Sequence, residues 1–347
     1  MTAMKINRRR MAGLSLVETM VAITISLILM GGAITLFINN KVTYESTDNM
    51  SRLQENARFA IDFMIRDLRM AGYFGCNNAI DKVNSTIAGA GDLVDITSPL
   101  EGFDDSLAAW SPSGSNDVVA DVGGGTFGDP LDNTDGVTIR RLSGNNVMVT
   151  ASALNSLDTP SAHGLAEDDF GAVEDCGGAD IFQVDAAAAD SVDLVANTSR
   201  EYFTNGDTTD PSNPRLAAFI AVRYYIGTGT NGPSLFRQSV RNGGIEVQEL
   251  IEGVESMHLL YGVDTDADNV PDTYVEAGNA LLDSVPEWES VIAVRIAMLV
   301  RTLQEYGPVT ETDAADYVLN DFTFTAGGDR FKRRIFNTTV QLRNRLT

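Results

Sequence analysis

A run of 25 residues, 14–38, contains a single charged side chain, Glu18, and this run constrains the fold more than any other feature of the chain. A helix rises about 1.5 Å per residue, so the run would extend about 37 Å, enough to cross a hydrocarbon core of about 30 Å. The sequence therefore predicts one transmembrane helix at residues 14–38.

The segment before this run, residues 1–13, is short and basic: MTAMKINRRRMAG. Positive charges gather on the cytoplasmic side of a membrane helix. We therefore expect the N-terminus to face the cytoplasm and the rest of the chain to lie on the other side of the membrane.

Glu18 needs a physical explanation, because an ionised acid inside the bilayer costs about 2.5 to 3.5 kcal/mol on insertion scales. A secretory signal places its small-residue cleavage site after the apolar run, whereas here Ala12 and Gly13 precede it. If the chain is cut between Gly13 and Leu14, the new α-amine of another subunit could lie beside Glu18. The alternative is an interfacial acid that reaches the lipid headgroups.

Residues 13–18, GLSLVE, resemble the class III signal of type IV pilins, with glycine before the cut and glutamate fifth in the mature chain. Leu14 departs from the phenylalanine usual in major pilins. The resemblance implies cleavage and N-methylation by a prepilin peptidase in the inner membrane, followed by incorporation into a filament. Residues 1–13 would then be a leader.

Helical spacing of apolar residues continues beyond the membrane segment and predicts one helix over residues 14–72, with Gly72 as its stop. The residues of this pattern are Leu53, Ala57, Ala60, Ile61, Met64, Leu68 and Ala71. Residues 73–347 are expected to form a β-rich head, so the predicted class is α+β, with the long helix packed on a mostly antiparallel sheet.

Strand signals in this head are rich in β-branched and aromatic residues. They lie at 137–142, 147–152, 181–184, 192–195, 219–226, 235–240, 291–302 and 334–343. Residues 77–134 are predicted to be loops with short strands. Residues 245–257 fit either a helix or a pair of strands.

Three further segments are similar to the PilW family of minor pilins: residues 54–76, 255–272 and 333–344. The resemblance implies a minor pilin that joins other minor pilins in a tip complex that primes polymerisation of the type IV pilus. Its implied partners are the prepilin peptidase, the other minor pilins, the major pilin and the inner-membrane assembly platform. A type II secretion pseudopilin and a calcium-dependent pilus-tip adhesin are the alternatives.

Two cysteines, Cys76 and Cys176, occur in a part of the chain expected to face an oxidising periplasm. A disulfide is the natural interpretation, and two buried free thiols are the alternative. Closing a loop of about 100 residues contributes at most roughly 4.7 kcal/mol in the chain-entropy model.

Alternating aspartates in residues 264–272, DTDADNVPD, suggest a calcium loop, because calcium prefers clustered oxygen ligands. The spacing departs from the EF-hand at Asn269, which replaces glycine, and at Val275, which replaces the bidentate acid. Glu276 is a further candidate for the shell, and a solvated acidic turn is the alternative. The candidate ligands are Asp264, Asp266, Asp268, the carbonyl of Val270, and Asp272.

Other classes of function find little support in the sequence. The formal net charge of −23 disfavours nucleic-acid binding. Residues 227–232 satisfy G-x-G-x-x-G but lie between two β segments, so they are expected to form a hairpin rather than a dinucleotide site. His258 lacks a catalytic signature around it and is expected to be structural. We expect a non-enzymatic protein that requires no cofactor.

Overall fold

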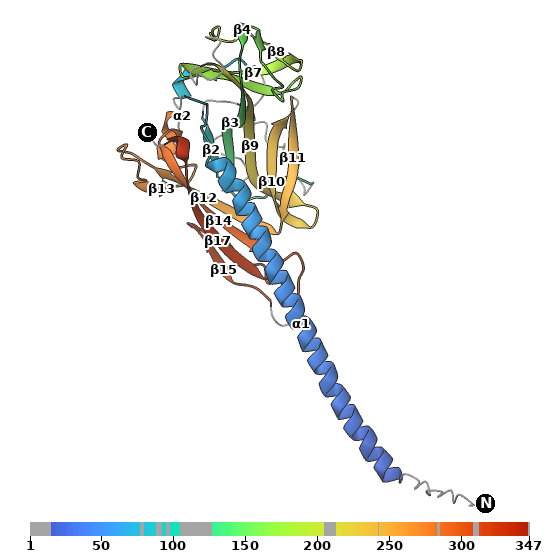
Figure 1. Ribbon diagram of the computed structural model, residues 1–347. Helices are drawn as coiled ribbons and strands as arrows, with labels where there is room; N and C mark the ends of the chain where they lie inside the picture. Colours follow the sequence, from blue (N-terminus) through green and yellow to red (C-terminus); the bar gives the residue numbers. More distant parts are fainter. Residues whose placement is uncertain are drawn as a thin grey trace, which may run out of the picture.

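The computed structural model describes residues 15–76, 80–87, 92–94, 98–104, 127–204, 213–241, 243–282, 285–307 and 312–345. Its longest element is the helix α1 (Leu16–Leu68), which runs along a β-rich head and extends far beyond it (Figure 1). The 53 residues of α1 give a length of about 80 Å. The helix ends just before Gly72, whose φ of +73° suits glycine.

The second half of α1 packs on the head through the face that the sequence pattern predicts. Leu53, Ala57, Ala60, Met64 and Leu68 are each at most 2% exposed and share one core cluster with strands of both larger sheets. These positions recur every three or four residues, so they lie on one side of the helix. The predicted amphipathic helix is confirmed.

Eleven of the described strands form one mixed sheet, in which β1 runs parallel to β7 and the other pairs are antiparallel. The path of hydrogen-bonded neighbours is β11-β10-β9-β6-β7-β8-β5-β4, and β3 joins β9 to β2. The strands are β1 (Val83–Ser85), β2 (Leu100–Phe103), β3 (Gly136–Met148), β4 (Ala151–Ala153), β5 (Ser156–Asp158), β6 (Phe170–Asp175), β7 (Gly178–Ala187), β8 (Ser191–Leu194), β9 (Arg215–Gly229), β10 (Gly232–Arg241) and β11 (Gly244–Glu252).

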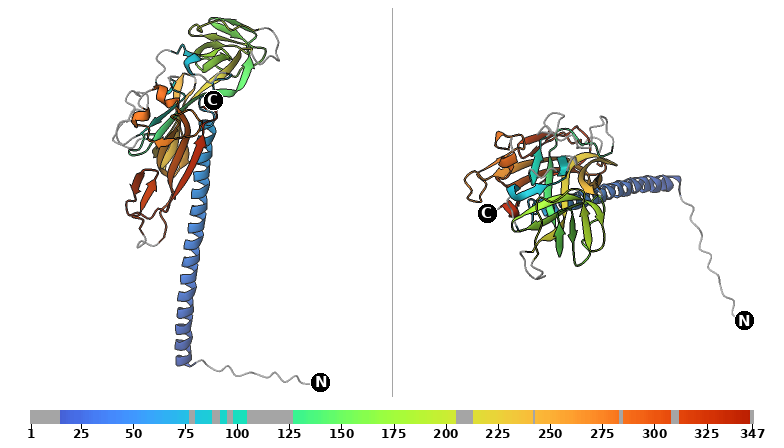
Figure 2. Two further views of the ribbon diagram at one scale, coloured as in Figure 1. Left: turned by 90° about the vertical axis from the view of Figure 1, so that its left-hand side faces the viewer. Right: turned by 90° about the horizontal axis from the view of Figure 1, so that it is seen from above.

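A second sheet of four described strands, in the order β13-β12-β14-β17, lies against α1 (Figure 2). The strand β14 lies inside this sheet and is almost entirely apolar, as expected for a strand with both faces covered. One face meets α1, and the other packs on the hairpin of β15 and β16. The strands are β12 (Val254–Val263), β13 (Thr273–Val275), β14 (Val291–Arg301), β15 (Asp316–Leu319), β16 (Phe322–Thr325) and β17 (Arg333–Gln341).

Short helices complete the described elements. They are the α-helix α2 (Val285–Trp288) and the 3₁₀ helices η1 (Ile80–Lys82), η2 (Asp92–Val94), η3 (Ala280–Leu282) and η4 (Arg343–Arg345). The strands β4, β7 and β8 lie at the end of the head farthest from the N-terminus, as both side views show (Figures 1 and 2).

A buried acid, Asp67, ties the last turn of α1 to the large sheet. Its carboxylate accepts hydrogen bonds from Arg141 Nη2 at 2.8 Å and from the Tyr224 hydroxyl at 2.6 Å. Burial, reinforced by the neighbouring carboxylate, raises the pKa of the Tyr224 phenol, so this hydroxyl stays a donor. The partners compensate the charge that α1 brings into the interface.

One strand prediction is wrong, the open choice for residues 245–257 is settled as a pair of strands, and the predicted sheet is confirmed with a division into parts. Residues 147–152 do not form one strand, because β3 ends at Met148 and β4 begins at Ala151. Residues 245–257 belong to the strands β11 and β12, which join different sheets and are separated by Gly253 at a φ of +85°. The predicted mostly antiparallel sheet is confirmed, and it is divided into two larger sheets and a hairpin.

The seam between α1 and the head gives a first prediction. Met64→Ala should lower the free energy of unfolding by about 2 to 5 kcal/mol, because it opens a cavity at a fully buried position. Chemical denaturation of the full chain in detergent micelles measures the loss. The control is Phe63→Ala, which truncates the adjacent side chain, 44% exposed, and should cost much less. Equal losses in the two variants would contradict the packing described here.

Candidate functional site

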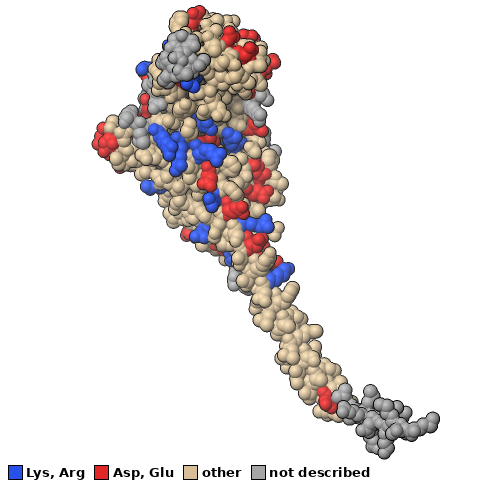
Figure 3. Space-filling view, viewed as in Figure 1, with Lys and Arg blue, Asp and Glu red and all other residues tan. Residues whose placement is uncertain are grey.

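The first half of α1 stands free of the head and presents apolar side chains on all sides. The residues that face outward include Leu16, Val17, Ile28, Leu29 and Phe37, each more than 60% exposed. Almost no charge lies on this half of the helix, in contrast to the head (Figure 3). Of the described helices, α1 is the one long and apolar enough to cross a membrane.

A shallow groove of about 260 Å³ lies on this free half, with the small side chains of Thr19, Ala22 and Ser26 beside the larger ones of Ile23, Leu27 and Met30. A hydroxyl in this groove needs no partner outside the helix when it donates to a backbone carbonyl of the same helix. The Thr19 hydroxyl donates to the Ser15 carbonyl in this way. Small residues allow two membrane helices to approach closely. The groove therefore suits helix packing.

Glu18 lies in the first turn of α1, where the structure leaves its side chain exposed. Ser15 caps the helix, and its hydroxyl accepts the backbone N–H of Glu18 at 3.2 Å. The predicted processing residues, Gly13 and Leu14, lie outside the described residues. Glu18 is thus near the predicted new N-terminus and has no ion-pair partner among the described residues.

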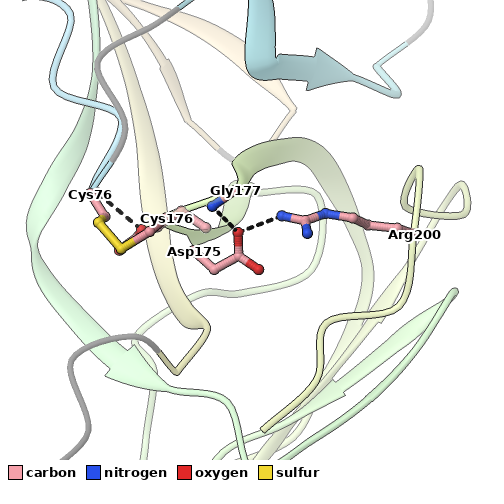
Figure 4. Close-up of a disulfide and its surroundings, with 6 residues drawn as sticks. Cys76, Asp175, Cys176, Gly177 and Arg200 are labelled. Atoms are coloured by element: carbon pink, nitrogen blue, oxygen red, sulfur yellow. Dashed lines mark hydrogen bonds and ion pairs between the residues drawn. A yellow bond between two sulfur atoms is a disulfide. The ribbon is translucent and has the colours of Figure 1, made fainter.

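The predicted disulfide between Cys76 and Cys176 is present, with the two Cα atoms 4.8 Å apart (Figure 4). It joins the segment just after α1 to the turn between β6 and β7. The Cys76 N–H also donates to Glu174 at 3.2 Å, and burial raises the pKa of this carboxyl. On the other side of the bridge, Asp175 binds the Gly177 N–H and the Arg200 guanidinium.

The aspartate loop at residues 264–272 brings three of its predicted ligands together. Carboxylate oxygens of Asp264, Asp266 and Asp268 lie within 4.8 Å of one another. The charge of Asp268 is the main cause that raises the pKa of Asp266. Asp272 lies outside this group of three. Its Oδ2 accepts hydrogen bonds from the Thr265 hydroxyl at 2.6 Å and the Thr265 N–H at 2.8 Å, which lower the pKa of Asp272.

Two further candidates for this loop are Val270 and Glu276. Val270 is 58% exposed, and its N–H donates to Asp268 at 2.8 Å. Glu276 hydrogen bonds with Asp321 in a separate pocket and does not extend the cluster of three aspartates. Calcium at this loop stays a prediction from the sequence.

That separate pocket, which we call the acidic pocket, has a volume of about 170 Å³ and is lined by Asp104, Asn133, Asp135, His258, Glu276, Asp321 and Phe322. His258, expected to be structural, is 6% exposed, and its ring stacks on Phe322 with 4.1 Å between centroids. Asn320, in the turn between β15 and β16, donates to the His258 carbonyl at 2.9 Å and holds this hairpin over β12.

Sequence reasoning missed the acidic pocket because its residues come from five separate segments of the chain. Its acids are far apart in the sequence, so no local pattern indicates that they lie together. The glycine-rich residues 227–232 form the predicted hairpin: Gly229 pairs with Gly232, and β9 and β10 flank the turn.

Comparison with family models defines the class of the protein first. Residues 8–34 match the model described as Prokaryotic N-terminal methylation motif, which is a prepilin-like signal. Residues 223–344, which include the second sheet and most of the acidic pocket, match the model Type IV Pilus-assembly protein W. Together with the long apolar helix and the β-rich head, these two matches support a PilW-family type IV pilin. None of the curated proteins matches the chain.

The disulfide gives a second prediction. Reduction should lower the free energy of unfolding by about 2 to 4 kcal/mol, because the bridge closes a long loop in the unfolded chain. Chemical denaturation with and without dithiothreitol measures the difference. The variant Cys76→Ser should unfold at the same denaturant concentration in both conditions. A reduced wild type as stable as the oxidised one would contradict this role.

The aspartate loop gives a third prediction. If it holds calcium, calorimetry on the full chain in detergent should show saturable heat that Asp266→Asn removes, because that residue supplies one of the three converging carboxylates. Asp193→Asn, an exposed acid on β8, is the charge-matched control and should bind as wild type does. A solvated acidic turn would give no heat and no thermal shift with calcium chloride.

Proposed function

We propose that the chain is a structural minor pilin that helps prime assembly of the type IV pilus and is incorporated near its tip. One observation carries the proposal: α1 is a single helix with an apolar half free of the head and a second half built into the head's core. The free half has the length and composition to enter a membrane or a bundle of like helices.

The mechanism that we propose is assembly. A prepilin peptidase in the inner membrane cuts between Gly13 and Leu14 and methylates the new N-terminus. The α-amine of a neighbouring subunit then pairs with Glu18 as the helices pack. This pairing compensates both charges in a medium where either charge alone is costly. The exposed position of Glu18 in the first turn of α1 supports it.

The proposed topology follows from the basic leader: the N-terminus is cytoplasmic and the head is periplasmic until the subunit enters the pilus. The disulfide fits an oxidising compartment. Other minor pilins, the major pilin and the inner-membrane platform are the proposed partners.

We also propose that the protein is not an enzyme and needs no cofactor for assembly. The matched family is described by pilus assembly, and the features that support this role are packing surfaces. A position near the tip suits the head, because a head of this bulk fits few positions in a regular lattice of smaller subunits.

A complementation experiment tests the proposal. A strain that lacks this chain should lose surface pili, and the wild-type gene should restore them. Glu18→Ala should still mature to a protein that begins at methylated Leu14, as mass analysis can show. Its incorporation into sheared pili should fall about tenfold or more, because the neighbouring amine is left without its partner.

Glu45→Ala is the matched control, since it removes an acid from the same helix outside the apolar run and should restore pili fully. Two outcomes would overturn the proposal. Normal pili with lost protein secretion would indicate a pseudopilin, and normal pili with lost surface attachment would indicate an adhesin.

A further inference from the structure

The acidic pocket lies between the two larger sheets and the β15–β16 hairpin. The residues that line it carry a net negative charge. Four acids contribute carboxylates, and none of the described residues that line the pocket is a lysine or an arginine. The acids are Asp104, Asp135, Glu276 and Asp321. Asp135 is fixed in place, because one of its oxygens accepts the Leu259 N–H at 2.7 Å. The pocket is therefore built to offer hydrogen-bond acceptors to a cation.

His258 supplies the second observation. The side chain is 8% exposed, and its Nδ1 lies 3.4 Å from Asp135 Oδ1. A carboxylate is an acceptor, so this contact places the ring hydrogen on Nδ1 and leaves a lone pair on Nε2. Nε2 is buried and has no hydrogen-bond partner among the described residues. A buried acceptor without a donor is costly, and a ligand that brings an N–H would remove the cost.

Glu276 and Asp321 are two acids that interact within the pocket. Hydrogen bonding with Asp321, together with burial and the negative charge of Asp321, raises the pKa of Glu276 to about 7. A positively charged group between the two side chains would favour their ionised forms.

The spacing of the acceptors decides which kind of cation fits. The ligands of a metal ion converge on one point, and among the described residues the three aspartates of the 264–272 loop are the group whose ligand atoms lie within 4.8 Å of one another. The acidic pocket does not meet that condition. A guanidinium carries five N–H donors that point outward in a plane, so it can join acceptors that are set farther apart.

We propose that the acidic pocket receives an arginine side chain from a partner protein. Its guanidinium bonds to Glu276 and Asp321 at the open side of the pocket and to the His258 imidazole at the buried side. The inference concerns the head alone and holds whether or not the chain primes pilus assembly.

The two histidines of the chain allow a direct test. Full-length protein in detergent micelles, labelled with ¹³C at histidine Cε1, should give one NMR signal from His258 and one from His163. Titration with N-acetyl-arginine amide should shift the His258 signal in a saturable way. The signal of His163, whose Nε2 lies 2.8 Å from the Ala188 carbonyl oxygen, should not shift and serves as a control for the rest of the head.

Neutral and charge-matched controls isolate the proposed contact. N-acetyl-citrulline amide has the same shape without the charge and should leave the His258 signal in place. Asp321→Asn should weaken binding of the arginine probe roughly tenfold, because a charge-assisted hydrogen bond is lost. Glu167→Gln removes an exposed acid away from the pocket and should bind as wild type does. Unchanged thermal unfolding of both variants would show that the fold is kept.

Three results would overturn the proposal: no saturable shift of the His258 signal, an equal shift with the citrulline probe, or unchanged binding in Asp321→Asn. Zinc chloride and calcium chloride form a further arm. A His258 shift with either salt at concentrations where the arginine probe has no effect would assign the pocket to a metal ion instead.

Discussion

The architecture depends on one packing seam, in which the second half of α1 fills a groove between the two larger sheets. Alanines at positions 57 and 60 let the helix approach the strands closely, and larger apolar residues on either side complete the core. This face of the helix is buried against the head. The same contacts set the direction in which the free apolar half of α1 leaves the head.

Polar groups buried at the seam have hydrogen-bond partners that compensate their burial. Asp67 reaches the large sheet only because Arg141 and Tyr224 meet it there. A comparable arrangement holds the other sheet, where Arg333, with a side chain 1% exposed, binds Glu255, Asp313 and Asp329. These networks connect elements that are distant in sequence, and breaking one member would leave a buried charge without compensation.

Much of this could be predicted from sequence wherever the signal was local. Helical spacing identified the face of α1 that is buried, and apolar runs located β9, β10 and β14 because these strands are covered on both sides. The β6 strand, FGAVED, was missed because it is short and carries acids at its end. The division into two sheets depends on the turn at Gly253, whose effect on direction no spacing rule reveals. The acidic pocket was invisible for the same reason, since only the fold brings Asp135, His258 and Asp321 together.

The disulfide has a mechanical consequence. Cys76 follows α1 by a few residues, and Cys176 lies between β6 and β7 in the large sheet. When tension acts along α1, it passes into the sheet through the sulfur bridge and the seam. The bridge bypasses the loops between the two cysteines, whereas β3 in the same segment takes part in the seam through Arg141. Those loops can therefore vary in length and sequence without weakening the connection between α1 and the far end of the head.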